Sequence, residues 1–215
     1  YIVMPHNAPS SKIAAVQHYG AHLRFCEPTI AARIAALDEW LKEVDASVIP
    51  PYNDPLVIEG QATLFYEWHK QCPEIEAFVY PIGGGGVISG AIEARDAMQL
   101  STPIFGAEPE AADDAFRSIE RGERVIEHNP KTMADGLRTT LGEHTFPIIQ
   151  GGVQAIELVS EAHIADGMRD IYSYLKQAIE PSAAVAYAAA IRRSELRGKK
   201  VGVLLCGGNA DLSDL

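Results

Sequence analysis

Four consecutive glycines, Gly83, Gly84, Gly85 and Gly86, form the stretch of this sequence best suited to bind a charged ligand. They follow the apolar run 77–82 and precede a helix-like stretch, a pattern that predicts strand, loop and helix. A loop without Cβ atoms lets several N–H groups converge, and the first helical turn adds unpaired N–H groups and a positive dipole end. Such a concavity binds a phosphate dianion without lysine or arginine. A flexible turn between strand and helix is the alternative.

Two further loops that follow expected strands also carry unusual side chains. Residues 108–114 are rich in Glu and Asp, and residues 206–209 read Cys-Gly-Gly-Asn. In parallel α/β sheets, ligands bind beyond the carboxyl ends of the strands. Two glycine-rich strand ends therefore suit one ligand held at two points. Taken alone, Cys206 favours a different interpretation, a small buried thiol at a strand end.

Strands and helices are expected to alternate along the chain. The apolar runs predict strands at residues 2–4, 23–26, 47–49, 77–82, 104–107, 156–159 and 201–205. Helical periodicity and capping residues predict helices at about 12–19, 30–44, 56–70, 87–94, 111–119, 146–153, 160–179 and 181–196. This alternation predicts an α/β fold, a parallel sheet with helices on both faces.

The composition of the chain argues against some classes of binding partner. The 215 residues are 47% hydrophobic and 22% charged, enough for one large domain or two small lobes. A net charge of −11 without a basic stripe argues against nucleic acid and against anionic membranes. No apolar run approaches transmembrane length, and no signal peptide is visible. Three cysteines without CxxC spacing favour reduced thiols in the cytoplasm over disulfides or zinc.

A series of short motifs runs along essentially the whole chain. They are Val3-Met4-Pro5 with Ala8-Pro9, Asp54-Pro55 with Ile58-Glu59-Gly60-Gln61, the tetraglycine with Val87, Ala107-Glu108-Pro109, Ala134-Asp135-Gly136-Leu137-Arg138-Thr139, Phe146-Pro147-Ile148-Ile149, Glu180-Pro181 and Cys206-Gly207-Gly208-Asn209. In this order they resemble the serine/threonine dehydratase and serine racemase group of pyridoxal-phosphate (PLP) enzymes, which share the tryptophan-synthase-β-like fold type II. The common order is more specific than any single motif.

The resemblance implies a set of cofactor contacts. Residues 83–86 and the Val87 amide would cradle the PLP phosphate. Cys206, followed by Gly207, stands where the family usually has Ser or Thr facing the pyridine nitrogen. A thiol is neutral and hydrogen-bonds weakly, so it would not keep that nitrogen protonated as a carboxylate does, which favours direct β-elimination over a long-lived carbanion. Glu180 matches a family glutamate near the ring; its alternative is a surface carboxylate at a helix end.

The resemblance also implies a divalent cation beside the glycine loop. The matching ligands are the carboxylates of Glu108 and Asp114 and the carbonyl of Ala112. An all-oxygen shell suits Mg²⁺, Ca²⁺ or Mn²⁺ rather than zinc. The alternative is an acidic helix start, with Asp113 and Asp114 placed favourably against the helix dipole.

The largest departure from the family is a missing lysine. The family's Schiff-base lysine lies early in the chain, in a Ser-x-Lys-x-Arg setting, before a loop that binds the substrate carboxylate. None of the seven lysines here has that setting, and roughly the first third of the family pattern has no counterpart. We therefore expect no catalytic lysine in this chain, and we expect the polypeptide alone to be inactive.

Two classes of function follow. In the first, the chain is the carboxy-terminal two thirds of a PLP-dependent ammonia-lyase that converts a hydroxy amino acid such as L-serine or L-threonine to a 2-oxo acid and ammonia; serine racemase or 3-hydroxyaspartate dehydratase are alternatives. In the second, it is a non-catalytic ligand-binding protein. The start within a strand favours the first. The resemblance further implies a homodimer acting on small amino acids, with residues 1–48 completing a small domain and residues 49–215 forming the large PLP-binding domain.

Overall fold

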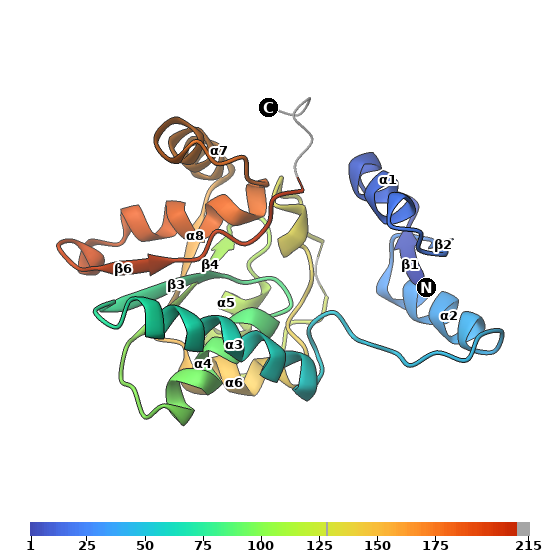
Figure 1. The fold of residues 1–215 in the computed structure, drawn as a ribbon, viewed down its shortest axis with the longest axis horizontal. Coiled ribbons are helices and arrows are strands. Elements are labelled where there is room, and N and C mark those ends of the chain that lie inside the picture. The colour runs from blue at the N-terminus through green and yellow to red at the C-terminus, as the bar shows by residue number, and fades with distance from the viewer. Residues whose placement is uncertain (128, 210–215) are drawn as a thin grey trace. The chain divides into compact units, whose positions relative to one another are not determined.

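The chain folds into two compact units. A computed structural model describes residues 1–127 and 129–209. The smaller unit holds residues 1–48 together with Asn209, and the larger unit holds residues 49–208. In both, strands alternate with helices along the chain, as Figure 1 shows. No helix among the described residues is long and apolar enough to cross a bilayer.

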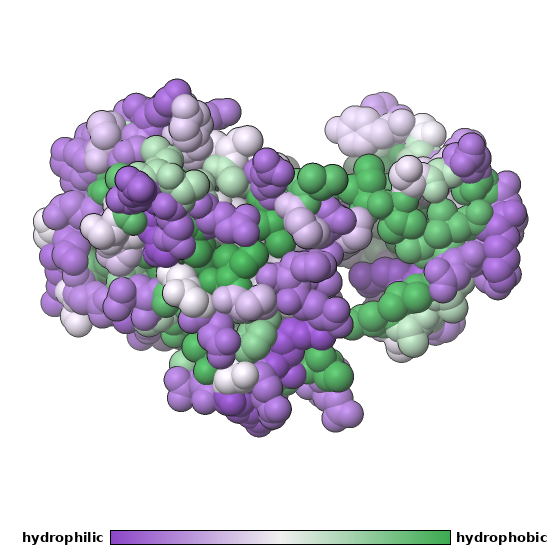
Figure 2. Space-filling view, turned by 90° about the horizontal axis from the view of Figure 1, so that it is seen from below, coloured by the Kyte–Doolittle hydropathy of each residue, from purple (hydrophilic) through white to green (hydrophobic). Residues whose placement is uncertain are grey.

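The smaller unit has a two-stranded parallel sheet and little core. Strand β1 (Ile2–Pro5) pairs with β2 (Leu23–Cys26), and helices α1 (Ser10–His18) and α2 (Ile30–Leu41) complete the unit. Within residues 1–48 the buried side chains are those of Cys26 and Trp40. Hydrophobic side chains gather on the face of this unit seen in Figure 2. The smaller unit therefore contributes few buried contacts of its own.

The prediction of a strand at residues 47–49 is wrong. Residues 45–50 have no regular structure, and the Ile49 side chain is 80% exposed. Val48 and Ile49 have β-branched side chains, but no described strand lies beside them to supply a ladder of hydrogen bonds. Pro50 and Pro51 follow, and each lacks the N–H group that such a ladder needs.

The larger unit is built on a four-stranded parallel sheet, which confirms the predicted α/β class. The strand order is β5-β4-β3-β6, and the register pairs Val79 with both Phe105 and Val203. Because all four strands are parallel, their carboxyl ends lie at one edge of the sheet. The strands are β3 (Ala77–Pro81), β4 (Ile104–Pro109), β5 (Ala155–Val159) and β6 (Val201–Val203).

Helices cover both faces of this sheet (Figure 1). One face packs against α7 (Glu161–Asp170) and α8 (Pro181–Arg192), in a core rich in alanine. The other face carries the aromatic core of Phe65, Phe78 and Tyr80, under the remaining helices. These are α3 (Pro55–Gln71), α4 (Gly86–Ala97), α5 (Asp114–Arg121) and α6 (Thr145–Gly152). Single turns of helix lie at Asp135–Leu137 (η1), Ile171–Leu175 (η2) and Ser194–Leu196 (η3).

Several boundaries differ from the sequence-based ones. The helix expected over 160–179 ends at Asp170 and continues only as the π-helical turn η2, because Lys176 takes a left-handed φ of 56°. Helix α5 begins at Asp114 rather than at residue 111, since a turn closed by the Ala112 N–H on the Pro109 carbonyl precedes it. The last strand ends at Val203 rather than at residue 205.

Helix α3, which packs against α4, starts at a capped end that gives a first testable prediction. The Asp54 Oδ1 accepts the N–H of Leu56 at 2.9 Å and of Val57 at 3.3 Å. We expect Asp54→Ala to lower the free energy of unfolding by about 1 kcal/mol, as measured by urea denaturation. Exposed Glu59 in the same helix is the control, and Glu59→Ala is expected to change that free energy by less than about 0.5 kcal/mol. Equal losses in both variants would contradict the cap.

Candidate cofactor site

The tetraglycine connects the end of β3 to the start of α4, as the sequence predicted. Gly84, Gly85 and Gly86 are buried, and Gly85 caps α4 with φ of 86° and ψ of 0°. Its carbonyl accepts the Ser89 N–H at 3.0 Å. By contrast, the N–H groups of Gly84, Gly85 and Gly86 donate to no group within the described part of the chain. Because buried N–H groups are almost always paired in native proteins, these three point to a bound acceptor.

The loop is enclosed so closely that only glycine fits. A Cβ atom on Gly83 would lie 2.9 Å from the Gly136 carbonyl oxygen, and one on Gly85 would lie 2.7 Å from the Ile149 side chain. A Cβ on Gly84 would overlap the ring of Tyr52. The tetraglycine is therefore a closely packed loop in which added side chains would overlap their neighbours.

Tyr52 is a wall of this loop that the sequence analysis did not single out. Its ring lies against Gly84 and its backbone against Gly86. The next residue, Asn53, accepts the His144 N–H on Oδ1 at 2.9 Å and so ties the same segment to the start of α6. The Pro-rich segment 50–55 before a helix was the available signal, but nothing in its spacing pointed at the glycines.

The second glycine-rich strand end lies beside the first. Val79 of β3 is paired with Val203 of β6, two adjacent parallel strands. Gly83 and Gly207 each come four residues after this pair. Gly207 has a φ of 121°, a conformation that suits glycine, and its carbonyl accepts the Glu180 N–H at 3.2 Å. A Cβ on Gly207 would overlap the Glu180 carboxylate. The two loops therefore start at the same edge of the sheet, as a ligand held at two points requires.

Glu180 and Cys206 set the electrostatics at this second end. Glu180 precedes α8 and is only 8% exposed, so it is a helix-terminal carboxylate that faces inward rather than one on the surface. The Cys206 thiol is exposed, yet desolvation by the surrounding chain, and secondly the Glu180 charge, raise its pKa. The thiol therefore stays neutral near pH 7.

The turn at residues 134–139 joins the two ends of the site. The Gly136 N–H donates to Ser182 Oγ at 3.0 Å, and a Cβ on Gly136 would lie 3.2 Å from Glu180 Oε1. Its carbonyl lies against Gly83 on the other side. Gly136 therefore lies against both the glycine loop and Glu180.

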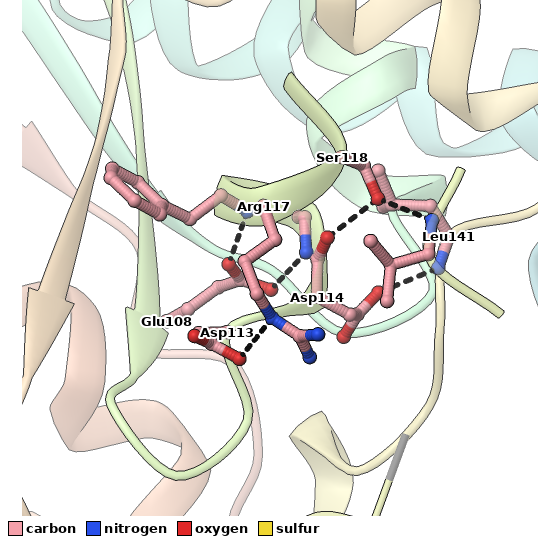
Figure 3. Close-up of polar contacts among 9 residues, drawn as sticks. Glu108, Asp113, Asp114, Arg117, Ser118 and Leu141 are labelled. Atoms are coloured by element: carbon pink, nitrogen blue, oxygen red, sulfur yellow. Dashed lines mark hydrogen bonds and ion pairs between the residues drawn. The ribbon is translucent and has the colours of Figure 1, made fainter. Parts of the chain in front are cut away.

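The carboxylates expected to bind a cation lie at the start of α5 (Figure 3). Glu108, at the end of β4, is fully buried and accepts the N–H groups of Ala115 at 3.0 Å and Phe116 at 2.8 Å. Asp114 is also fully buried and accepts the Leu141 N–H at 3.0 Å. Ala112, in the turn between them, is buried as well. No group of three or more His, Cys, Asp and Glu side chains within residues 1–127 and 129–209 is arranged to hold a metal.

The pKa values of both buried carboxyl groups are raised. Burial, and secondly the Asp114 charge, raise the pKa of Glu108 well above its ordinary value. Burial raises the pKa of Asp114 to about 7. The adjacent cation, Arg117, is paired through Nε with Asp113 Oδ1 at 2.8 Å. Carboxylate and carbonyl oxygens are the ligands that hard divalent cations prefer.

Comparison with known proteins places the chain in a family. The family model described as "Pyridoxal-phosphate dependent enzyme" matches residues 1–207. The chain belongs to the pyridoxal-phosphate-dependent enzymes. Relatives of this family include the beta-hydroxyaspartate dehydratase of Paracoccus denitrificans, 40% identical over the whole chain and 68% of the relative, and the serine racemase of Oryza sativa, 37% identical over the whole chain and 65% of the relative. The structure of maize serine racemase matches with a TM-score of 0.94 and 37% identity, over 99% of this chain and 67% of that one.

Membership in the PLP-dependent enzymes confirms the predicted family and its fold. The chain spans about two thirds of the length of the two curated relatives. Its residues fit the cofactor, because buried, unpaired N–H groups at Gly84–Gly86 suit a phosphate. A neutral thiol and a buried carboxylate lie at the adjacent strand end.

Proposed function

We propose that this chain is the cofactor-binding part of an enzyme that removes water from a hydroxy amino acid such as L-serine or L-threonine. The β-hydroxyl leaves as water after the α-proton is removed, and water then hydrolyses the resulting enamine, after its tautomerisation to an imine, to a 2-oxo acid and ammonia. Dehydration of 3-hydroxyaspartate and racemisation of serine are the alternatives, and the relatives bear these names. Bound PLP supplies the electron-withdrawing ring that loosens bonds at the α-carbon of an amino acid.

The buried, unpaired N–H groups of the tetraglycine carry this proposal. Gly84, Gly85 and Gly86 present them at the N-terminus of α4, where the helix dipole adds positive potential. At the other end of the site, the neutral Cys206 thiol offers a weak hydrogen bond to a ring nitrogen without supplying a proton. A ring nitrogen left unprotonated favours elimination over reactions that need a long-lived carbanion.

The experiment that tests this function is an intact mass of the purified protein after incubation with PLP and reduction with borohydride. A mass above the 23.3 kDa of this chain, with one pyridoxyl adduct, would show that a lysine-bearing part exists in the native protein. That protein should release a 2-oxo acid and ammonia from serine, threonine or 3-hydroxyaspartate. Formation of D-serine in place of ammonia would favour the racemase. A mass of 23.3 kDa without an adduct would exclude the enzyme function for this polypeptide.

We further propose that Glu108, Asp114 and the Ala112 carbonyl hold Mg²⁺, Ca²⁺ or Mn²⁺. The burial of both carboxylates and the raised pKa values of their side chains support a cation at this turn. Such an ion would fix the turn after β4, next to the strand that carries the glycine loop. The acidic helix start is compatible with it, since Asp113 and Asp114 also lie at the N-terminus of α5.

Three expectations from the sequence remain part of this proposal. The protein would work in the cytoplasm, and it would form a homodimer. Residues 1–48 would complete the small domain of the enzyme, while residues 49–215 would belong to its large PLP-binding domain. The separation of the chain into units near residue 48 supports that division.

A further inference from the structure

Thr145, the first residue of α6, makes the hydrogen bond that anchors the glycine loop. Its side chain is fully buried. The Thr145 hydroxyl donates to the Gly84 carbonyl oxygen at 2.8 Å, and it accepts the Gly142 N–H at 2.8 Å. The Gly142 carbonyl is a poorer acceptor for the same hydroxyl, at 3.5 Å. Because the accepted N–H occupies one side of the oxygen, the hydroxyl proton is directed to Gly84.

The direction of the Gly84 carbonyl determines where the Gly85 N–H points. Both groups belong to one peptide unit, and the described chain contains no cis peptide bond. In a trans peptide the C=O and N–H bonds point in opposite directions. Holding the carbonyl toward Thr145 therefore turns the Gly85 N–H away from Thr145, to a side where no described residue accepts it.

A glycine loop needs such an anchor because its backbone has few intrinsic preferences. Without Cβ atoms, the peptide between Gly84 and Gly85 can rotate at low cost, and a rotated peptide would present its carbonyl oxygen to an anion in place of the N–H. The side chains that enclose the loop restrict its position, but Thr145 bonds directly to the peptide in question. Preorganised donors bind more tightly because their ordering cost is met before the ligand arrives.

We propose that Thr145 is a positioning residue for phosphate recognition, fixing the Gly84–Gly85 peptide so that its N–H faces the phosphate of the cofactor. This inference rests on the proposed function of the loop as a phosphate cradle. Thr145 itself touches no phosphate. Its effect is confined to ligands that carry the phosphate group, and it needs a hydroxyl at this position rather than a side chain of a given size.

Three substitutions separate the hydroxyl from the packing. Thr145→Val keeps the shape and removes the hydroxyl, Thr145→Ser keeps the hydroxyl, and Thr145→Cys replaces it with a weak donor. The probes are PLP and pyridoxal, which lacks the phosphate, each titrated by fluorescence into the 215-residue chain. We expect Thr145→Val to weaken PLP binding about tenfold, Thr145→Cys to weaken it less, and Thr145→Ser to change it by less than about twofold, with pyridoxal binding unchanged throughout.

A second measurement follows the peptide directly. In the wild-type chain and Thr145→Ser, inorganic phosphate should shift the amide NMR signals of Gly85 and Gly86, and in Thr145→Val the Gly85 shift should be largely lost. If Thr145→Val does not fold, the comparison of Thr145→Cys with Thr145→Ser tests the role of the hydroxyl, by the same PLP affinity and Gly85 shift. The role of Thr145 would be overturned if Thr145→Ser matched Thr145→Val, or Thr145→Cys, in both PLP affinity and Gly85 shift. In that case, a wild-type chain that still prefers PLP over pyridoxal would leave the proposed function intact. A wild-type chain without that preference would overturn both.

Discussion

Gly85→Ala is expected to abolish tight PLP binding and to lower the free energy of unfolding by about 3 kcal/mol. Gly85 has a φ of 86°, where an alanine is strained by about 1–2 kcal/mol. Its new Cβ would also lie 2.7 Å from Ile149 and 2.9 Å from Leu141, which adds an overpacking cost of about 1–3 kcal/mol. Relief of either strain moves the peptide, and with it the N–H that faces the phosphate.

A matched substitution separates this effect from a general response to removing a glycine. Gly60 lies inside α3, is exposed, and a Cβ there would meet no atom within 4 Å. Gly60→Ala is expected to raise the free energy of unfolding by about 0.5–1 kcal/mol and to leave PLP binding unchanged. Urea denaturation and PLP titration of both variants provide the comparison. A Gly85→Ala protein that binds PLP like the wild type would contradict a loop fitted to glycine.

The sequence predicts the glycine loop and the elements that flank it well, because the sequence signals for them are local. An apolar run, four glycines and a helical start specify β3, the loop and α4 without knowledge of the rest of the chain. The failures occur where a distant partner decides. Residues 47–49 have the side chains of a strand but no neighbouring strand, and the helix after Asp170 is stopped by one left-handed residue, Lys176. Neither fact is encoded in local periodicity.

The candidate site shows the same division between local and long-range information. The family resemblance carried by the order of the motifs predicts the tetraglycine, Glu180 and Cys206 as cofactor contacts. Thr145 and Tyr52 are not indicated in this way, because each acts on the loop across a long sequence separation; the Thr145–Gly84 bond spans 61 residues. A threonine at a helix start ordinarily suggests a cap. Only its contact with the Gly84 carbonyl reveals the second role.

The Asp114 carboxyl is expected to make the protein less stable as the pH rises, when divalent cations are absent. Burial raises its pKa from about 3.8 to about 7, with Asp113 adding to the rise and the Leu141 N–H and Arg117 opposing it. Between these two values the unfolded chain has lost the proton that the folded chain keeps. The folded state then binds more protons, so its stability falls with increasing pH, by at most about 1.4 kcal/mol for each pH unit.

The comparison of the wild-type chain with Asp114→Asn isolates this one group. In EDTA, the free energy of unfolding of the wild type relative to Asp114→Asn should fall between about pH 5 and about pH 7.5, by about 1–3 kcal/mol. Urea denaturation at both pH values measures the difference. Asp113→Asn is the matched control, because Asp113 is half-buried and already paired with Arg117. For that variant, the difference from the wild type should not vary with pH in the same way.

Addition of a divalent cation should reverse the loss in the wild-type chain. An ion that binds the ionised Glu108 and Asp114 binds only the folded state, so it raises the free energy of unfolding as its concentration exceeds its dissociation constant. At about pH 7.5, Mg²⁺, Ca²⁺ or Mn²⁺ should therefore stabilise the wild type and Asp113→Asn but not Asp114→Asn. Stabilisation of all three proteins alike would place the ion elsewhere. A response of none of them would mean that the two carboxyl groups are a buried start of α5 that binds no cation.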